Sequence, residues 1–223
     1  MTSLRERYAT IFGHGRMTER VVFFSDAVFA IALTLLVIDL RVPEVDNGET
    51  SLDVIVSLIP GFLGYVISFC VIAINWSGHH RKFRVINAFD SRLLQLNFLL
   101  LFLIAFTPFP TSLISEFPGE VPSVVLYASV IISLNLVQLA MWSYAWHHDM
   151  IDTLVEPDIY RYVVRNLLVV PVVFGSSIVV AIFWDAQIAM YWWLLMVPLS
   201  IIMGRLGGGA KIPSGAQSSG AHE

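Results

Sequence analysis

Six strongly apolar segments divide the chain, and stretches rich in charged, proline and glycine residues separate them. The segments cover residues 21–40, 54–76, 93–114, 124–145, 167–184 and 188–203. A helix that crosses a bilayer needs about 20 residues, with a range of roughly 17–25, so the last segment is short and must lean on its neighbours. The segments lack the period-two alternation of barrel strands, and lipid requires each to satisfy its own backbone hydrogen bonds. The pattern therefore predicts an all-α membrane protein with six transmembrane helices.

Lysine and arginine are spread unevenly over the connections between these segments. If there are six spans, twelve of the 13 basic residues fall on one side of the membrane, and only Arg41 falls on the other. The twelve are Arg5, Arg7, Arg16, Arg20, Arg81, Lys82, Arg84, Arg92, Arg161, Arg165, Arg205 and Lys211. Because cytoplasmic loops carry an excess of lysine and arginine, we predict that both termini are cytoplasmic.

The composition agrees with a membrane protein. Hydrophobic residues make up 57% of the chain, charged residues 13%, and the mean hydropathy is +0.74, whereas soluble domains carry about 25% charged residues. The net charge of −4 gives no reason to expect nucleic-acid binding. We expect a cytoplasmic segment over 1–19 without a signal peptide, a membrane domain over 20–204 and a flexible tail over 205–223. The single cysteine, Cys70, cannot form an intrachain disulfide and is expected to pack as a small apolar residue.

The predicted outer connections are acidic. They contain Glu44, Asp46, Glu49, Asp53, Glu116, Glu120 and Asp185. These carboxylates can simply keep the outer loops soluble, or they can attract cations to a vestibule. The sequence leaves both interpretations open.

The first apolar segment contains an acid, Asp26, about one and a half turns inside its predicted start. An ionisable side chain there is costly and marks a functional or structural polar contact. A polar cluster at the end of the second segment lies at a matching depth, and we expect Ser25 and Asp26 to form hydrogen bonds with it. Its members are Asn75, Trp76, His79, His80 and Arg81. This contact can be a clasp between helices with no part in transport, or it can take part in ion or proton movement.

Beyond Asp26, three bulky apolar residues form a stripe on the first helix. Ile31, Leu35 and Ile38 follow the spacing i, i+4, i+7, which places them on one face, with Thr34 beside them and Asp39 beyond them. Such a stripe usually faces lipid or a packed neighbour. Small residues nearby allow close approach of helices, which raises the alternative of a pore-lining face.

The first helix also carries a motif that resembles a known family. Arg20-x-x-x-Phe24-Ser25-Asp26 is similar to the Arg-x-x-x-Phe-Ser-Asp signature of the transmembrane protein 175 family, the endolysosomal potassium channels and their bacterial relatives. The likeness continues to Asp39 and recurs in His79-His80-Arg81-x-Phe83, Asp90, Leu96-Asn97 and Phe106-Thr107-Pro108-Phe109-Pro110-Thr111. It covers roughly residues 16–204. Position 27, often glycine in bacterial relatives, is alanine here.

The resemblance implies a homotetramer whose first helices line a central pore. By position, Ile31 would form the narrowest layer, Leu35 and Ile38 further layers, and Asp39 the outer mouth. Thr34 would match a threonine linked to selectivity. The chain lacks a Thr-Val-Gly-Tyr-Gly filter, so selectivity would come from pore width and from the cost of removing water at an apolar ring.

Adjacent histidines occur at positions 79–80 and 147–148. A zinc, copper or haem site is conceivable there, but adjacent histidines rarely serve one metal, and interfacial histidines usually cap helices or bind headgroups. We therefore expect no metal and no cofactor. No Ser–His–Asp set or Gly-rich phosphate loop indicates an enzyme.

These observations predict a potassium-preferring cation channel in the prokaryotic cell membrane, with lipids and permeant monovalent cations as its partners. The alternative is a proton-linked secondary transporter that uses Asp26 and the histidines. Such transporters usually show internal repeats and broken helices at mid-membrane, which the sequence does not display. A non-conducting membrane scaffold is a third interpretation.

Overall fold

The computed structural model describes residues 14–38, 50–196 and 199. Its helices are α2 (His14–Ile38), α3 (Ser51–Phe83), α4 (Ser91–Phe106), α5 (Pro108–Glu116), α6 (Val121–His147), α7 (Pro157–Phe183) and α8 (Ala186–Trp192), followed by the short η1 (Trp193–Leu195). Within these residues the one β contact is an isolated bridge between Ile86 and Ile151. The prediction of an all-α protein is confirmed for this part of the chain.

Five helical spans are long and apolar enough to cross a membrane. They are Glu19–Ile38, Val54–Phe83, Ser91–Glu116, Val121–His147 and Pro157–Phe183, and they match the first five predicted segments. The sixth, 188–203, overlaps α8 and η1 at its start, and most of its remainder lies outside the described residues. The sixth crossing therefore stays a prediction.

Several helices extend beyond the apolar segments. The α3 helix continues to Phe83, so His79, His80 and Arg81 lie within it, and α7 begins at Pro157, well before the predicted residue 167. Polar residues at a membrane face can continue a helix because water and headgroups accept their side chains, and proline is well suited to the first helical position. Hydropathy alone therefore places these boundaries inside the true helix ends.

The third span is broken at Thr107. Proline has no backbone N–H and its ring clashes with the preceding turn, so Pro108 ends α4 and begins α5. The Thr107 N–H bonds to the Ile104 carbonyl at 3.2 Å, and the Thr111 hydroxyl donates to the Thr107 carbonyl at 2.9 Å. The first bond gives a partner to the Ile104 carbonyl, which the missing N–H of Pro108 would otherwise leave without one.

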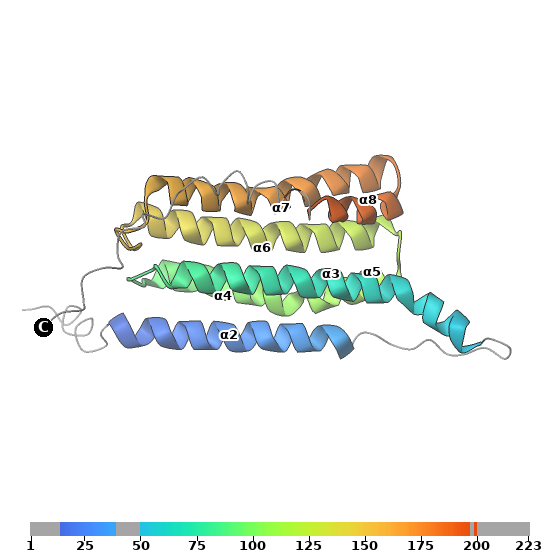
Figure 1. Cartoon of the computed structure of the whole chain (residues 1–223), viewed down its shortest axis with the longest axis horizontal. Helices are drawn as coiled ribbons and strands as arrows, with labels where there is room; N and C mark the ends of the chain where they lie inside the picture. The colour runs from blue at the N-terminus through green and yellow to red at the C-terminus, as the bar shows by residue number, and fades with distance from the viewer. Residues whose placement is uncertain (1–13, 39–49, 197–198, 200–223) are drawn as a thin grey trace, which may run out of the picture.

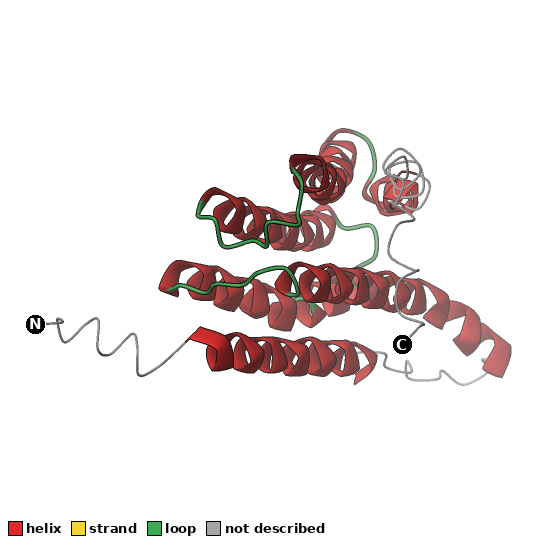
Figure 2. Ribbon diagram, turned by 60° about the vertical axis from the view of Figure 1, so that its left-hand side comes forward, coloured by secondary structure: helices red, strands yellow, loops and turns green. Residues whose placement is uncertain are grey.

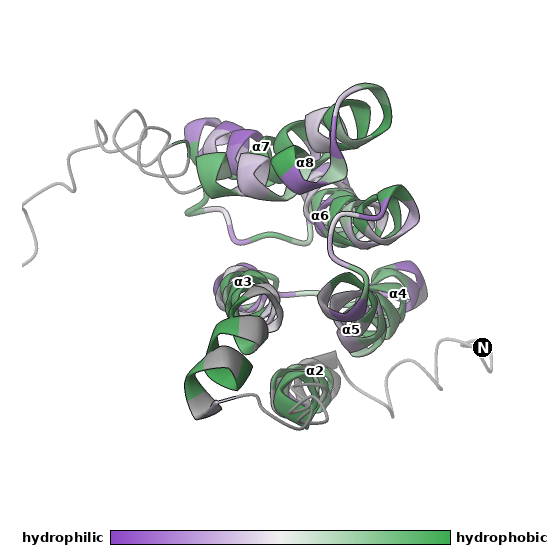
Figure 3. Cartoon of the chain, turned by 90° about the vertical axis from the view of Figure 1, so that its right-hand side faces the viewer, coloured by the Kyte–Doolittle hydropathy of each residue, from purple (hydrophilic) through white to green (hydrophobic). Residues whose placement is uncertain are grey.

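The helices form layers along the bundle (Figure 1). The α2 helix lies at one edge and packs against α3, α4 and α5, whereas α6 lies between α4 and α7. Seen along the bundle, α2 and α7 occupy opposite edges (Figure 3). The centre is filled by apolar side chains from α2 to α7, which include Phe29, Leu36, Ile72, Leu93, Leu100, Ile104, Ile131, Leu134 and Phe174.

Connections lie at the two ends of the helices (Figure 2). We call one end, with residues 84–90, residues 148–156 and the start of α2, the basic end, because all lysines and arginines of the described residues lie toward it. There the Asn87 N–H donates to the Met150 carbonyl at 2.9 Å, and Asp90 caps α4 by accepting from the Leu93 N–H at 2.8 Å. Burial acts to raise the pKa of Asp90, but hydrogen bonds from Tyr144 and from backbone N–H groups outweigh it and hold this pKa below its usual value.

Candidate functional site

The two sides of α2 have different surroundings. Its buried side consists of Ser25, Phe29, Ala32 and Leu36, at most 1% exposed and spaced four, three and four residues apart. The opposite side carries the predicted pore residues. Ile31 is 58% exposed, Leu35 40% and Ile38 68%, and Thr34 is exposed with its hydroxyl bonded to the Ile31 carbonyl at 2.8 Å. The predicted stripe thus faces away from the other described helices of its chain. Asp39 lies outside the described residues.

Asp26 contacts α3 as the sequence indicated. The Trp76 indole N–H donates to its Oδ1 at 2.8 Å, and the Trp76 ring stacks on His80 with ring centres 5.7 Å apart. Trp76 keeps 40% of its surface exposed, and Asp26 is only partly buried. The contact therefore sits at the margin of the bundle.

Ser25 enters a buried network through a residue of α4 that sequence reasoning did not assign to the site. The Asn97 side-chain N–H donates to Ser25 Oγ at 3.1 Å, and its Oδ1 lies 2.9 Å from His79 Nε2. Because the amide nitrogen of Asn97 is used as a donor, its oxygen accepts and His79 Nε2 carries the proton. Ser25 also donates to the Val21 carbonyl at 2.8 Å. The network joins α2, α3 and α4 with side chains that are at most 1% exposed.

The expectation that Ser25 bonds directly to the α3 polar cluster is therefore corrected. Asn97 stands between Ser25 and His79, and Asn75 faces α6 instead, where Gln138 donates to its Oδ1 at 2.7 Å. The signal for Asn97 was present, because an amide inside an apolar span must find partners.

Other members of the motif remain at the surface. Arg20 and Arg81 are exposed, and within the described residues neither forms an ion pair. Phe24 is also exposed and meets Phe98 of α4 edge-on, with ring centres 6.0 Å apart. The first-helix motif, which does not include Arg81, thus contributes one buried residue, Ser25, one partly buried residue, Asp26, and two exposed residues, Arg20 and Phe24.

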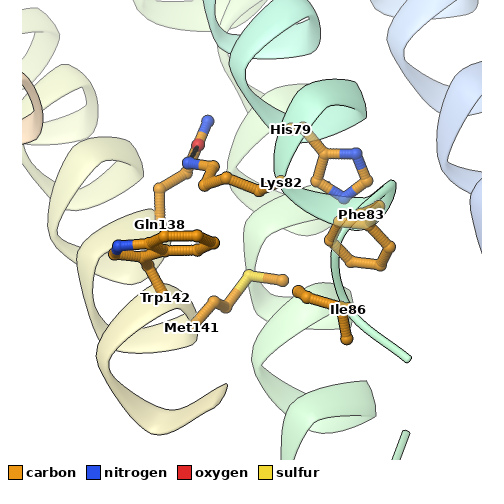
Figure 4. A pocket seen from close by; sticks show the side chains of 7 residues that line it. All are labelled: His79, Lys82, Phe83, Ile86, Gln138, Met141 and Trp142. Carbon is orange, nitrogen blue, oxygen red and sulfur yellow. Dashed lines mark hydrogen bonds between the residues drawn. The ribbon is translucent and has the colours of Figure 1, made fainter. Parts of the chain in front are cut away.

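A small cavity lies behind the network at the basic end (Figure 4). His79, Lys82, Phe83, Ile86, Gln138, Met141 and Trp142 line it. Its volume of about 10 Å³ has room for about one water molecule, so an organic substrate does not fit. The Lys82 ammonium donates to Gln138 Oε1, and His79 Nδ1 has no partner among the described residues.

His147 and His148 lie at the C-terminal end of α6 and contact its last carbonyl groups. His147 Nδ1 lies 2.7 Å from the Ser143 carbonyl and His148 Nδ1 lies 3.0 Å from the Tyr144 carbonyl, each four residues back along α6. In the part of the chain that the structure describes, no three His, Cys, Asp or Glu side chains gather as a metal site would require.

Known proteins resemble the chain in both sequence and structure. The profile of the family described as endosomal/lysosomal potassium channel TMEM175 matches residues 20–108, which include the motif, the stripe and the network. Potassium channel B446_29190 of Streptomyces collinus is 35% identical over 62% of this chain and 68% of its own length. Potassium channel Cha6605_3372 of Chamaesiphon minutus is 37% identical over 57% of this chain and 66% of its own length.

A human relative and a solved structure are also similar to the chain. The human protein, named endosomal/lysosomal proton channel TMEM175, is 25% identical over 83% of this chain and 36% of its own length. The crystal structure of a lysosomal potassium-selective channel TMEM175 homolog from Chamaesiphon minutus superposes with a TM-score of 0.69 at 26% identity. The superposition covers 87% of this chain and 100% of the chain in the crystal structure. With its motif, helical fold and relatives in agreement, this chain is a member of the TMEM175 family.

Proposed function

We propose that this protein is a potassium-preferring cation channel in which four copies of α2 surround a central pore. The observation that carries the proposal is the exposed stripe on α2, because three bulky apolar side chains lie there opposite a fully buried face. Two bacterial relatives and one structural neighbour are named as potassium channels, which supports potassium as the permeant ion.

In this proposal Ile31 forms the narrowest layer. A ring of isoleucine side chains offers an ion nothing that replaces its water, so the barrier depends on how tightly each ion holds its hydration shell. Sodium holds water more strongly than potassium and meets the higher barrier. Leu35 and Ile38 add apolar layers toward the other end, and Thr34 places a hydroxyl beside this face.

The proposal includes an orientation and a location. The basic end faces the cytoplasm because lysine and arginine are retained on that side. With the predicted sixth crossing included, both termini are cytoplasmic, and the prokaryotic cell membrane is the compartment. Four chains are proposed because the resemblance of the first-helix motif implies a homotetramer. The exposed stripe supports an assembly of copies around an axis, because other copies would cover its apolar side chains.

Single-channel recordings of Ile31→Asn test the pore assignment. An amide keeps the ring wet, so we expect the unitary potassium current to rise about twofold or more, with a larger gain for sodium. Val37→Asn is the matched control, since Val37 is 51% exposed on α2 but lies off the stripe. If Ile31→Asn and Val37→Asn both leave unitary current and selectivity unchanged, Ile31 does not line the pore.

The same recordings should also test proton conduction, because the human relative is named a proton channel. A proton-linked transporter is less well supported. Its candidate acid, Asp26, accepts a hydrogen bond from Trp76, and the cavity beside His79 has room for about one water molecule. Reversal potentials measured in a pH gradient at equal potassium concentrations separate proton permeation from potassium permeation.

A further inference from the structure

The exposed stripe on α2 extends to the basic end of the helix. Arg20, Phe24, Ala27, Ile31, Thr34 and Ile38 are all exposed and follow one another at steps of four, three, four, three and four residues. At about 100° per residue this spacing keeps them on one side of the helix. Arg20 therefore shares the face of the proposed constriction and lies about 16 Å from Ile31 along the axis.

Among the described residues, no carboxylate neutralises the charge of Arg20. Within the described residues it forms no ion pair. Asp26 points about 120° away around the helix and is bonded to Trp76 of α3. The adjacent Glu19 points about 100° away. Neither carboxylate faces the stripe.

We propose that Arg20 forms a ring of positive charge at the cytoplasmic mouth of the pore and limits the outward flow of cations. The inference rests on the proposed function, since four copies of α2 around an axis would contribute four guanidinium groups. The ring repels potassium ions and lowers their concentration at that mouth. Outward current, which draws ions from the cytoplasm, is reduced more than inward current.

Salt sets the size of this effect. The screening length is about 30 Å at 0.01 M and about 3 Å at 1 M ionic strength. At low salt the four charges act together on an ion at the axis, whereas at high salt each is largely screened. A side chain whose role is only structural would not give a salt-dependent ratio of outward to inward current.

The test compares Arg20→Gln and Arg20→Lys with wild type in symmetrical KCl at about 20 mM and about 1 M. At low salt Arg20→Gln is expected to raise the ratio of outward to inward unitary current about threefold. Arg20→Lys keeps the charge and should keep the wild-type ratio, and at high salt all three should agree. Arg165→Gln is the matched control, because it removes an exposed arginine of the same end from α7, at the opposite edge of the bundle.

Modification after assembly covers the case in which Arg20→Gln does not fold. Arg20→Cys in a Cys70→Ser background is modified by a cationic or an anionic thiol reagent from the cytoplasmic side. The cationic adduct should lower the outward current and the anionic adduct should raise it. Equal effects of the two adducts would overturn the proposal.

The outcomes also separate this inference from the proposed function. If Arg20→Gln leaves the current ratio unchanged at low salt while Ile31→Asn alters conduction, Arg20 lies outside the ion path and only the further inference fails. If neither variant has an effect, the pore assignment fails with it. If the wild-type protein carries no current, the channel function itself is wrong.

Discussion

Asn97 is expected to contribute more to stability than any residue of the first-helix motif. In Asn97→Ala, His79 Nε2–H loses its acceptor and Ser25 Oγ loses its donor. A buried donor left without a partner costs about 1–3 kcal/mol, and the second lost bond adds about 0.5–1.5 kcal/mol, close to 0.6 kcal/mol if it resembles the average bond between membrane helices. We expect the free energy of unfolding to fall by about 2–4 kcal/mol.

Asp26→Ala should cost less, about 0.5–1.5 kcal/mol. It removes a single hydrogen bond, and its donor, Trp76, remains 40% exposed and can bond to water or headgroups. From the sequence alone Asp26 is the more prominent residue, because an ionisable side chain inside an apolar segment is costly. Because Asn97 is fully buried and Asp26 is only partly buried, we expect the loss of Asn97 to cost more stability.

Unfolding of the detergent-solubilised protein by increasing SDS, followed by circular dichroism, measures these differences. Gln95→Ala is the matched control, because Gln95 lies two residues before Asn97 on α4 and is exposed. Changes at such positions usually stay within about 0.5 kcal/mol. Adding His79→Phe to Asn97→Ala removes the unpaired imidazole and should restore part of the stability, since His79 already packs against Phe29 and Phe83.

Two results would refute this reasoning. The network would not stabilise the protein if Asn97→Ala were no more damaging than Gln95→Ala. If the double variant were as unstable as the sum of its single variants, the unpaired His79 would not be the cause of the loss.

Two further predictions concern the ends of the helices. Gly119 has a φ of +84°, and a Cβ there would lie 2.9 Å from Gln187 Cγ, so Gly119→Ala should destabilise the protein by about 1–3 kcal/mol in the same assay. At Gly175 a Cβ would meet nothing within 4 Å, so Gly175→Ala should be neutral or stabilising by up to about 1 kcal/mol. Equal losses of stability in the two variants would contradict the argument. For the orientation, a cysteine at Asp185 in a cysteine-free background should react with an impermeant thiol reagent in intact cells and one at Arg84 should not, and labelling at position 84 would reverse the topology.

Much of the fold follows from the sequence because lipid imposes a simple rule on length and hydropathy. Five of the predicted spans coincide with long helices. The helix ends were predicted less well, because hydropathy detects the apolar centre of a span and misses polar turns such as residues 77–83 of α3. The break at Thr107 could have been expected from the two prolines that follow it.

The candidate site was predicted in part. Helical periodicity identified one face of α2, and its exposure agrees with that grouping. The similar depths of Asp26 and the α3 polar cluster in the membrane predicted the contact between Asp26 and Trp76. Depth alone could not predict which helix contacts Ser25, because the depth of a residue in the membrane does not reveal which spans are neighbours. Asn97 and Gln138 lie at suitable depths on different helices, and only packing assigns one to Ser25 and the other to Asn75.

The opposite faces of α2 have a consequence for how such a protein can diversify. Residues that anchor the helix, Ser25 and Phe29, share no side with Ile31 and Ile38. Substitutions on the exposed side therefore accumulate without disturbing the anchor, and libraries randomised at those positions should yield a high proportion of folded protein. On the proposal that the exposed side lines the pore, point changes there would retune the same scaffold for different ions, while random changes on the anchoring side would mostly be lost to misfolding.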